Sequence, residues 1–314
     1  MQVLWMVASA FLFATMGVFV KHASEFFTTP EIVFYRGLIG MAVLWWLARR
    51  QGVGLGTRHP WMHGWRSLVG VTSMGCWFYA ISKLPLATGM TFNYMSSLWM
   101  AAFFLLGALW TWRPGYAGER RSPNLALLGT ILLGFVGVLL LLQPNLDVPQ
   151  HGSAAVAATA GLLSGVLSAM AYIQVSALAR AGEPEARTVF YFCVGCTVGG
   201  GALMLQLGLS PWPGWQEAFY LLPIGLLAAG GQLCMTYAYS GARTPRATLV
   251  AANLQYTGLI FASAYSVFWF NDQINALGWL GMVLVAISGI AATALRARGA
   301  AAAQQPVAGK ASAA

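Results

Sequence analysis

The chain has 314 residues, of which 58% are apolar and 8% are charged, and its net charge is +9. So few charges would not cover so large an apolar fraction in water, so the composition excludes an ordinary soluble globular protein. The basic residues are divided among several connecting segments. This distribution argues against a nucleic-acid-binding patch and favours the known bias of basic residues toward the cytoplasmic side of a membrane.

Ten apolar runs are long enough to cross a bilayer core as helices, which takes about 20 residues each. They lie at residues 3–22, 31–48, 66–82, 87–111, 124–142, 155–178, 188–208, 218–240, 246–270 and 275–295. Strands of a β-barrel would be shorter and half polar, so the sequence predicts an all-α polytopic membrane protein. No basic residue precedes the first run, and further spans follow it at once, so we expect a transmembrane helix there and not a signal peptide.

The positions of the basic residues predict the orientation. With the N-terminus in the cytoplasm, most of them fall on the cytoplasmic side: Arg49, Arg50, Arg58, Arg66, Arg113, Arg120, Arg121, Arg180, Arg187, Arg243, Arg246, Arg296, Arg298 and Lys310. Only Lys21, Arg36 and Lys83 do not. We therefore expect a multi-pass protein of the cytoplasmic (inner) membrane with both termini in the cytoplasm.

A pattern in the middle of the chain occurs twice. The segments 79–102 and 239–262 align without a gap. The alignment keeps Tyr79/Tyr239, Pro85/Pro245, Ala87/Ala247, Thr88/Thr248, Asn93/Asn253 and Ala102/Ala262. Five helices in each half is an odd number, so the second half enters the bilayer upside down relative to the first. We expect one repeat over residues 1–144, an external loop over 145–153, an inverted repeat over 154–296 and a disordered cytoplasmic tail over 297–314.

Cysteines and acidic residues give little support for catalysis. Cys193 and Cys196 have C-x-x-C spacing, but a pair inside a span without a nearby histidine is a poor zinc or redox site. Packing of small buried residues explains them better. No span contains an aspartate, and Glu31, Asp272 and the histidines lie at span ends or in loops. We therefore expect no metal, no cofactor and no enzymatic activity.

Polar and aromatic residues inside the spans are the candidates for a substrate pathway. They are Trp77, Tyr79, Asn93, Ser96, Ser97, Tyr172, Gln232, Tyr239, Asn253 and Tyr256. The alternative is that they form interhelical hydrogen bonds, which is the ordinary role of serine and threonine in membrane helices. For Asn93 and Asn253 we favour a pathway role, because they occupy equivalent places in two inverted halves.

Two runs near the N-terminus resemble the opening of an EamA-type member of the drug/metabolite transporter superfamily. They are Phe13-Ala14-Thr15-Met16-Gly17-Val18-Phe19-Val20-Lys21 and Pro30-Glu31-Ile32-Val33-Phe34-Tyr35-Arg36-Gly37-Leu38-Ile39-Gly40. The segment Leu84-Pro85-Leu86-Ala87-Thr88 and the glycine-spaced fifth and tenth spans also fit, and the resemblance covers about residues 3–295. It implies a ten-helix carrier with inverted halves, a central cavity and alternating access.

By the same resemblance, Lys21 and Arg36 match basic residues of the family on its first two helices. A charge inside the second span is expensive unless it is paired or hydrated. Arg36 is expected either to hold Glu31 or backbone carbonyls as a structural pin, or to attract an anionic group of a substrate. Glu31 is expected to neutralise Arg36 or Lys21. The second half lacks an equivalent lysine at the end of its first helix.

These observations favour an alternating-access carrier of small organic metabolites, such as amino acids or their derivatives, with efflux favoured over uptake. Its partners are a small-molecule substrate and the lipid bilayer, and not nucleic acid. A non-transporting membrane scaffold and a channel are the alternatives. Because the middles of the spans lack carboxylates and histidines, we expect facilitated diffusion or exchange and not proton coupling. The sequence leaves the substrate and the oligomeric state open.

Overall fold

The computed structural model describes residues 2–96, 98–100, 102–103, 106, 125–142, 152–240 and 254–304. Within these ranges every regular element is a helix, and no strand is present. The prediction of an all-α protein is therefore confirmed for the described part of the chain.

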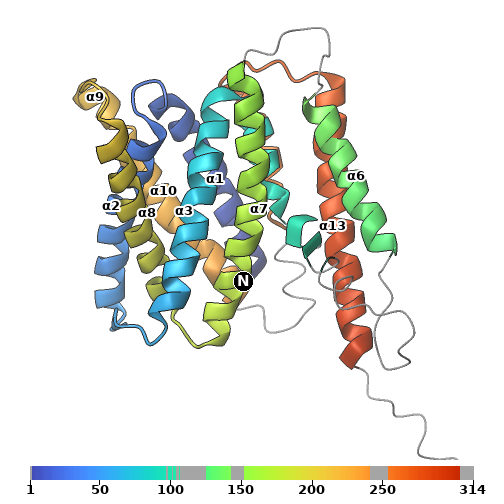
Figure 1. Ribbon diagram of the computed structural model, residues 1–314, viewed down its shortest axis with the longest axis horizontal. Helices are drawn as coiled ribbons and strands as arrows, with labels where there is room; N and C mark the ends of the chain where they lie inside the picture. The colour runs from blue at the N-terminus through green and yellow to red at the C-terminus, as the bar shows by residue number, and fades with distance from the viewer. Residues whose placement is uncertain are drawn as a thin grey trace, which may run out of the picture.

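Helices cover most of the described residues (Figure 1). They are α1 (Gln2–Ala23), α2 (Thr29–Arg50), α3 (Pro60–Lys83), α4 (Leu86–Tyr94), α6 (Leu125–Leu142), α7 (Gly152–Arg180), α8 (Glu185–Leu207), α9 (Trp215–Ala218), α10 (Leu221–Ser240), α12 (Thr257–Phe268) and α13 (Ala276–Gln304). Each of the ten expected spans coincides with at least part of a described helix. Among the described residues, five segments are long and apolar enough to cross a membrane, with mean hydropathies between 1.4 and 2.2: residues 3–23, 29–50, 154–180, 185–207 and 215–240.

Two helices are longer than the apolar pattern predicts. The third span was expected to begin at residue 66, but α3 begins at Pro60. The last helix, α13, continues to Gln304, so the tail that we expected to be disordered from residue 297 is helical up to that point. The extension is rich in alanine, which has the highest helix propensity, and adding residues to an existing helix requires no new nucleation. Residues 305–314 lie outside the described part of the chain.

Proline and glycine set several helix boundaries. The helix α3 starts with Pro60, while Pro85 and Pro184 directly precede α4 and α8. Proline suits a helix start because it lacks the N–H that would have no partner there. Gly182 (φ 80°) and Gly208 (φ 84°) follow α7 and α8 in the left-handed region, which glycine adopts without strain. These residues allow sharp turns between successive helices.

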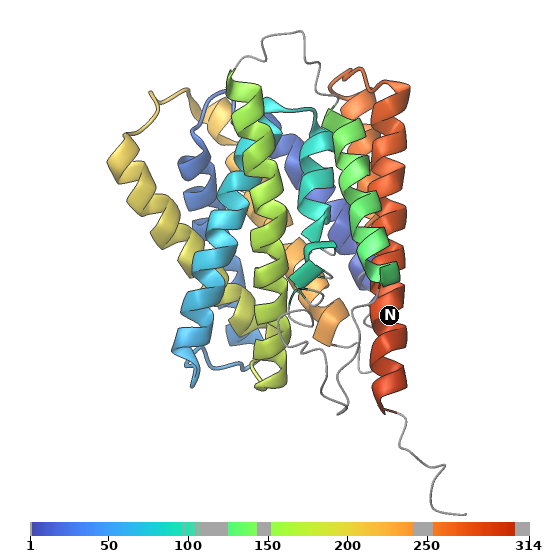
Figure 2. The same cartoon turned by 45° about the vertical axis from the view of Figure 1, so that its right-hand side comes forward.

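The helices form a bundle in which neighbouring helices are far apart in the chain (Figures 1 and 2). α2 packs along α8, α6 along α13, α1 along α10 and α3 along α7. Each of these pairs joins a helix that ends before residue 143 to one that begins after residue 151. The shorter helices α4 and α12 pack on each other, α4 also on α7, and α12 also on α1.

Glycines bring paired helices into close contact. A Cβ atom on Gly37 of α2 would lie 2.6 Å from the backbone nitrogen of Thr197 on α8. A Cβ atom on Gly137 of α6 would lie 2.8 Å from the carbonyl oxygen of Gly281 on α13. Small residues at such crossings let the backbones approach, and dispersion contacts between close backbones stabilise helix pairs in a membrane.

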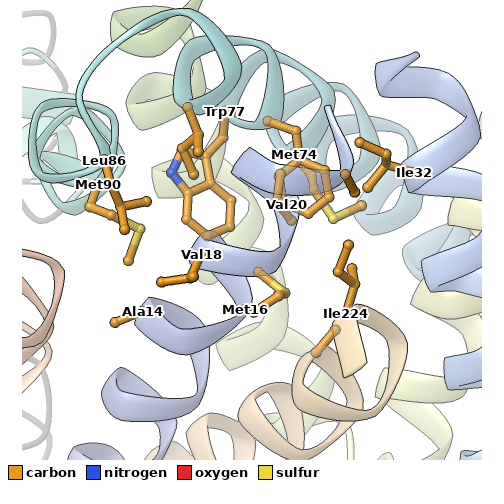
Figure 3. Packing of buried hydrophobic residues seen from close by; sticks show 14 of the residues in the cluster. Ala14, Met16, Val18, Val20, Ile32, Met74, Trp77, Leu86, Met90 and Ile224 are labelled. Atoms are coloured by element: carbon orange, nitrogen blue, oxygen red, sulfur yellow. The ribbon is translucent and has the colours of Figure 1, made fainter. Parts of the chain in front are cut away.

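Among the described residues, the largest cluster of buried apolar side chains is built around α1, α3 and α10 and extends to α2, α4, α8 and α12. Figure 3 shows Met16 and Val18 of α1 between Trp77 of α3 and Ile224 of α10. All four side chains are buried. This cluster holds α3 against α1 and thereby fixes the face of α3 on which Trp77 lies.

Candidate functional site

A cavity of about 50 Å³ lies among helices of both halves of the chain. It is lined by Phe13 (α1), Arg36 (α2), Arg66, Gly70, Ser73, Met74 and Trp77 (α3), Asn93 and Tyr94 (α4), Ser168, Ala171 and Tyr172 (α7), Phe192 (α8), Gln232 (α10) and Gln255, which precedes α12. The lining combines aromatic walls with amide, hydroxyl and guanidinium groups. This combination is typical of small-molecule sites, in which a few polar groups orient a ligand within a largely apolar pocket.

A chain of hydrogen bonds connects three helices at one side of the cavity. Asn93 Nδ2 donates to Ser168 Oγ at 3.0 Å, and Ser168 Oγ lies 2.8 Å from Ser73 Oγ. Ser73 Oγ donates to the carbonyl oxygen of Ser164 at 2.8 Å. Because that bond uses the one hydroxyl proton of Ser73, Ser168 donates to Ser73. The chain therefore fixes the orientation of the Asn93 amide at the cavity wall.

Two arginines line the cavity beside one aromatic ring. The guanidinium carbon of Arg66 lies 4.2 Å from the centre of the Phe192 ring, and that of Arg36 lies 5.4 Å from it. Arg36 Nη1 also donates to Cys196 Sγ at 3.4 Å, a weak acceptor. Both arginines are buried. Neither forms an ion pair with a described residue.

The structure brings together some of the residues predicted from the sequence. Arg36, Trp77, Asn93, Tyr172 and Gln232 line the cavity. Tyr172 interacts there with Ser168 and Gln255.

Other predicted pathway residues lie elsewhere. Tyr79 and the buried Ser96 are not part of the cavity lining, and Tyr239 packs beside Met235. Tyr256 is buried, and its hydroxyl and ring lie against Gly289 of α13. Ser97 and Asn253 lie outside the described residues.

The prediction that Glu31 forms an ion pair with Arg36 or Lys21 is wrong. The Glu31 carboxylate accepts hydrogen bonds from the backbone nitrogens of Thr28 (2.7 Å) and Ser210 (2.9 Å) and from the Ser210 hydroxyl (2.7 Å). It therefore caps the start of α2 and binds the loop after α8. Among the described residues it pairs with neither Arg36 nor Lys21. Glutamate in the first turn of a helix is favoured because it accepts from free backbone N–H groups and faces the positive end of the helix dipole.

Lys21 is paired at the same end of the bundle, outside the cavity lining. Its Nζ atom lies 3.2 Å from Asp272 Oδ2 and 4.3 Å from the centre of the Phe270 ring. Asp272 precedes α13, so this ion pair connects the end of α1 to the connection between α12 and α13. Both side chains are about one fifth exposed. The arrangement assigns Lys21 a structural contact.

At its other end the α2–α8 pair is connected by loop residues 54–57. Arg187 Nε donates to the carbonyl oxygen of Gly54 at 2.8 Å, and the Tyr191 hydroxyl donates to that of Leu55 at 3.0 Å. Thr57 Oγ1 donates to Glu183 Oε1 at 2.7 Å. The α2–α8 pair is thus held at both ends. At one end the loop after α8 binds the start of α2, and at the other end the loop after α2 binds the first turns of α8.

Glu183 is the centre of this second contact. Arg187 Nη1 donates to Glu183 Oε2 at 3.0 Å, and His63 Nε2 lies 3.4 Å from the same oxygen. Burial by itself would raise the pKa of Glu183, but the hydrogen bonds from Thr57 and Arg187 and the charge of Arg187 outweigh it. The pKa of Glu183 therefore lies below its ordinary value.

Arg66 is the most important residue that the sequence interpretation missed. The distribution of basic residues predicts it at the cytoplasmic start of a span, whereas α3 begins six residues earlier and carries Arg66 into the cavity wall. The signal was present in Pro60, since proline is favoured in the first turn of a helix. Phe13, Phe192 and Gln255 were also missed, because no local pattern distinguishes an aromatic or amide side chain that faces a cavity from one that faces a neighbouring helix.

The sequence of this chain is similar to those of known membrane transporters, and its fold is similar to that of a solved structure. The EamA-like transporter family matches residues 1–143. The pseudopaline exporter CntI of Pseudomonas aeruginosa is 31% identical over 289 residues, covering 92% of this chain and 94% of the exporter. An uncharacterised transporter of Helicobacter pylori is 25% identical over 290 residues, covering 88% of this chain and 89% of that protein. A crystal structure with 17% identity covers 95% of this chain and 98% of its own, with a TM-score of 0.63, and supports the fold alone. The chain therefore belongs to the EamA-like transporter family and is a multi-pass membrane transporter rather than an enzyme.

Proposed function

We propose that this protein exports small organic metabolites, amino acids or their derivatives, across the cytoplasmic membrane by alternating access. The observation that carries the proposal is the polar cavity lined by helices from both halves of the chain. A relative movement of the two halves would expose this site first to one side of the membrane and then to the other. The name of the exporter from P. aeruginosa supports metabolites as the substrate class and export as the direction.

The helix contacts support two inverted five-helix repeats, residues 1–144 and 154–296, with an external connection over 145–153. In that arrangement α1 corresponds to α7, and α3 corresponds to α10. Exchanging the halves then converts the α1–α10 contact into the α7–α3 contact, and both contacts are present. The α2–α8 and α6–α13 pairs convert into themselves and are also present. Such a pattern is expected when a two-fold axis relates the halves.

Within this proposal the cavity residues have distinct roles. Asn93 offers an amide whose orientation is fixed by the chain through Ser168. Trp77 and Tyr172 provide aromatic surface, and Gln232 provides a second amide from the other half. Asn253 remains a pathway residue on the basis of the sequence repeat alone.

The orientation proposed is with both termini in the cytoplasm, as the distribution of basic residues predicts. The contact around Glu183 then lies at the cytoplasmic end of the bundle, and the contacts of Glu31 and Lys21 lie at the external end. Opening the cavity to either side requires helices to separate at one end.

We also propose that transport is facilitated diffusion or exchange. Among the described residues no aspartate, glutamate or histidine lines the cavity, and such groups commonly carry the proton in coupled carriers. Glu31, the nearest candidate in the sequence, is bound to Thr28 and Ser210.

The test is release of metabolites from proteoliposomes. Purified protein is reconstituted and loaded with a bacterial metabolite extract, and mass spectrometry identifies the compounds that leave faster than from protein-free liposomes. A carrier then shows saturation, and unlabelled compound on the opposite side accelerates exchange of the labelled compound. A channel would release compounds without this acceleration, and a scaffold would release nothing above the protein-free control; either result refutes the proposed function.

Energy coupling is tested on the compound so identified. With equal concentrations on both sides and the membrane potential clamped, an imposed pH gradient should cause no accumulation of a substrate whose charge is constant. Sustained accumulation would refute facilitated diffusion and exchange, while leaving the carrier proposal intact.

A further inference from the structure

Three buried side chains in the cavity carry hydrogen-bond donors without a partner in the part of the chain that the structure describes. Arg36 is 2% exposed, Arg66 4% and Trp77 7%. The Nε atoms of both arginines, Nη1 of Arg66 and Nε1 of Trp77 have no hydrogen-bond partner among the described residues. All three residues line the same cavity. Arginine and tryptophan donate and do not accept, so the missing partner must be an acceptor.

The described chain supplies no negative charge to the two arginines. Glu31, Glu183 and Asp272 form their hydrogen bonds at the ends of the bundle, where they are bound to residues outside the cavity. An unpaired cation in a low-dielectric interior is strongly unfavourable, and charged residues within membrane spans mark functional sites. Two such cations beside one ring also repel each other. The cost of burying these two cations side by side must be offset by a negatively charged group from outside the described chain.

The surroundings hold the guanidinium groups in place without neutralising them. The Phe192 ring lies against both, which is a weak attraction compared with an ion pair. Gly70, one turn beyond Arg66, leaves room for its side chain: a Cβ atom there would overlap Arg66 Nη1 and lie 2.9 Å from Phe192 Cε2. The absence of a side chain at residue 70 thus allows Arg66 to extend along α3 into the cavity.

We infer that the transported substrate is an organic dianion with two carboxylate groups, one bound by Arg36 and the other by Arg66, with Trp77 Nε1 donating a further hydrogen bond. Two guanidinium groups need two negative charges, and their planar forks match carboxylate oxygens. The inference rests on the proposed function and narrows its substrate class to acidic metabolites, such as amino-acid derivatives that carry a second carboxylate. A phosphate ester offers the same oxyanion chemistry, and the test separates the two.

The first experiment compares variants in the release assay described above. Arg36→Gln and Arg66→Gln should each lower the release of the compounds exported by the wild type by at least about tenfold, since removing one partner of a buried charge pair is costly. Arg180→Gln removes a cation at the exposed end of α7 and should leave release unchanged. Arg66→Lys keeps the charge but loses the fork, so it should retain more release than Arg66→Gln. Gly70→Ala should reduce release because the methyl group displaces Arg66.

Thermal stability separates a binding role from a structural role. If the arginines bind substrate and do not stabilise the fold, Arg66→Gln removes an unpaired buried cation. The apparent melting temperature of the substrate-free protein should then be unchanged or higher. A variant that loses release and unfolds at a lower temperature would show that Arg66 supports the fold, and would overturn the inference.

A binding assay keeps the inference testable independently of transport. Millimolar N-acetylglutamate, a dianion, should raise the melting temperature of purified wild-type protein more than N-acetylglutamine, which differs by one amide, and more than phosphoserine. The difference should disappear in Arg66→Gln. Equal responses to the first two compounds would overturn the inference, and a larger response to phosphoserine would overturn the choice of carboxylate. Release of neutral or cationic compounds at rates unaffected by the arginine variants would overturn the inference while the proposed function stands.

Discussion

Asn93→Ala distinguishes a substrate-binding role from simple helix packing. The substitution removes the 3.0 Å hydrogen bond from Nδ2 to Ser168 and leaves the bond between Ser168 and Ser73 in place. A single interhelical hydrogen bond in a membrane protein contributes about 0.6 kcal/mol on average and at most about 1.7. The side chain borders an existing cavity, so its removal enlarges that space and does not open a new void in a packed core. The expected decrease in apparent melting temperature is therefore only about 1 to 4 °C.

The effect of Asn93→Ala on transport should be much larger than its effect on folding. If the oriented amide binds substrate, its loss leaves a substrate polar group without a partner, which costs about 1 to 3 kcal/mol. That range corresponds to a decrease of roughly fivefold to more than a hundredfold in transport at limiting substrate. The measurement is release from proteoliposomes, normalised to the amount of folded protein determined by size-exclusion chromatography.

Ser9→Ala is the matched control for Asn93→Ala. Ser9 Oγ donates to the carbonyl oxygen of Gly231 at 2.8 Å, a buried bond between α1 and α10. Ser9 is not part of the cavity lining, so this variant should show a similar decrease in melting temperature with transport close to wild type. Wild-type transport by Asn93→Ala, or an equal loss in both variants, would show that Asn93 is a packing residue and does not bind substrate.

Three further predictions address orientation, pH dependence and packing. A reporter fused after Arg298 should read cytoplasmic and one inserted in residues 145–152 external; a cytoplasmic signal from the second would contradict the inverted repeat. Because the pKa of Glu183 is lower in the folded protein than in the unfolded chain, its stabilising contribution is complete above the unfolded pKa of about 4.3 and is lost as pH falls through the folded pKa. Glu183→Gln should therefore lower the apparent melting temperature at pH 7, and below about pH 4.3 the melting temperature of the variant should depend less on pH than that of the wild type. Parallel curves of melting temperature against pH for variant and wild type would show that Glu183 does not contribute. Gly137→Leu should destabilise the protein, because a Cβ atom there would lie 2.8 Å from a backbone carbonyl of α13, whereas Gly129→Leu faces open space and should be tolerated; equal melting temperatures would count against the close α6–α13 contact.

The sequence predicted the helices well because the requirement for a membrane span is local. A bilayer demands about 20 consecutive apolar residues whose backbone groups bond within the same helix, so composition alone reveals most spans. Helix starts marked by Pro30 and Glu31 follow equally local rules. Among the described helices, α3 begins earlier and α13 ends later than expected, and α13 continues to Gln304 because alanine favours a helix even where the chain no longer needs to be apolar.

The candidate site was only partly predictable. Trp77, Asn93 and Tyr172 could be identified as polar or amphipathic groups that need partners within a membrane. Their hydrogen-bond partners could not be identified from the sequence, since Ser168, the partner of Asn93, lies 75 residues further along the chain on another helix. The sequence does not specify which face of a helix with apolar residues on all sides meets which neighbour.

Tertiary structure alone determined the charge pattern of the cavity. By sequence Glu31 lies five residues before Arg36 and is one of the partners expected for it, and Arg66 is expected at the cytoplasmic start of a span. In the structure Glu31 binds Ser210, Lys21 binds Asp272, and Arg66 joins Arg36 beside Phe192. The physical reason is that glycines such as Gly37 and Gly70 decide how closely helices and side chains can approach, and those approaches select the partner of each charge. Each membrane helix is specified by its own stretch of sequence. The two positive charges of Arg36 and Arg66 come to face one cavity only when α2, α3 and α8 pack together.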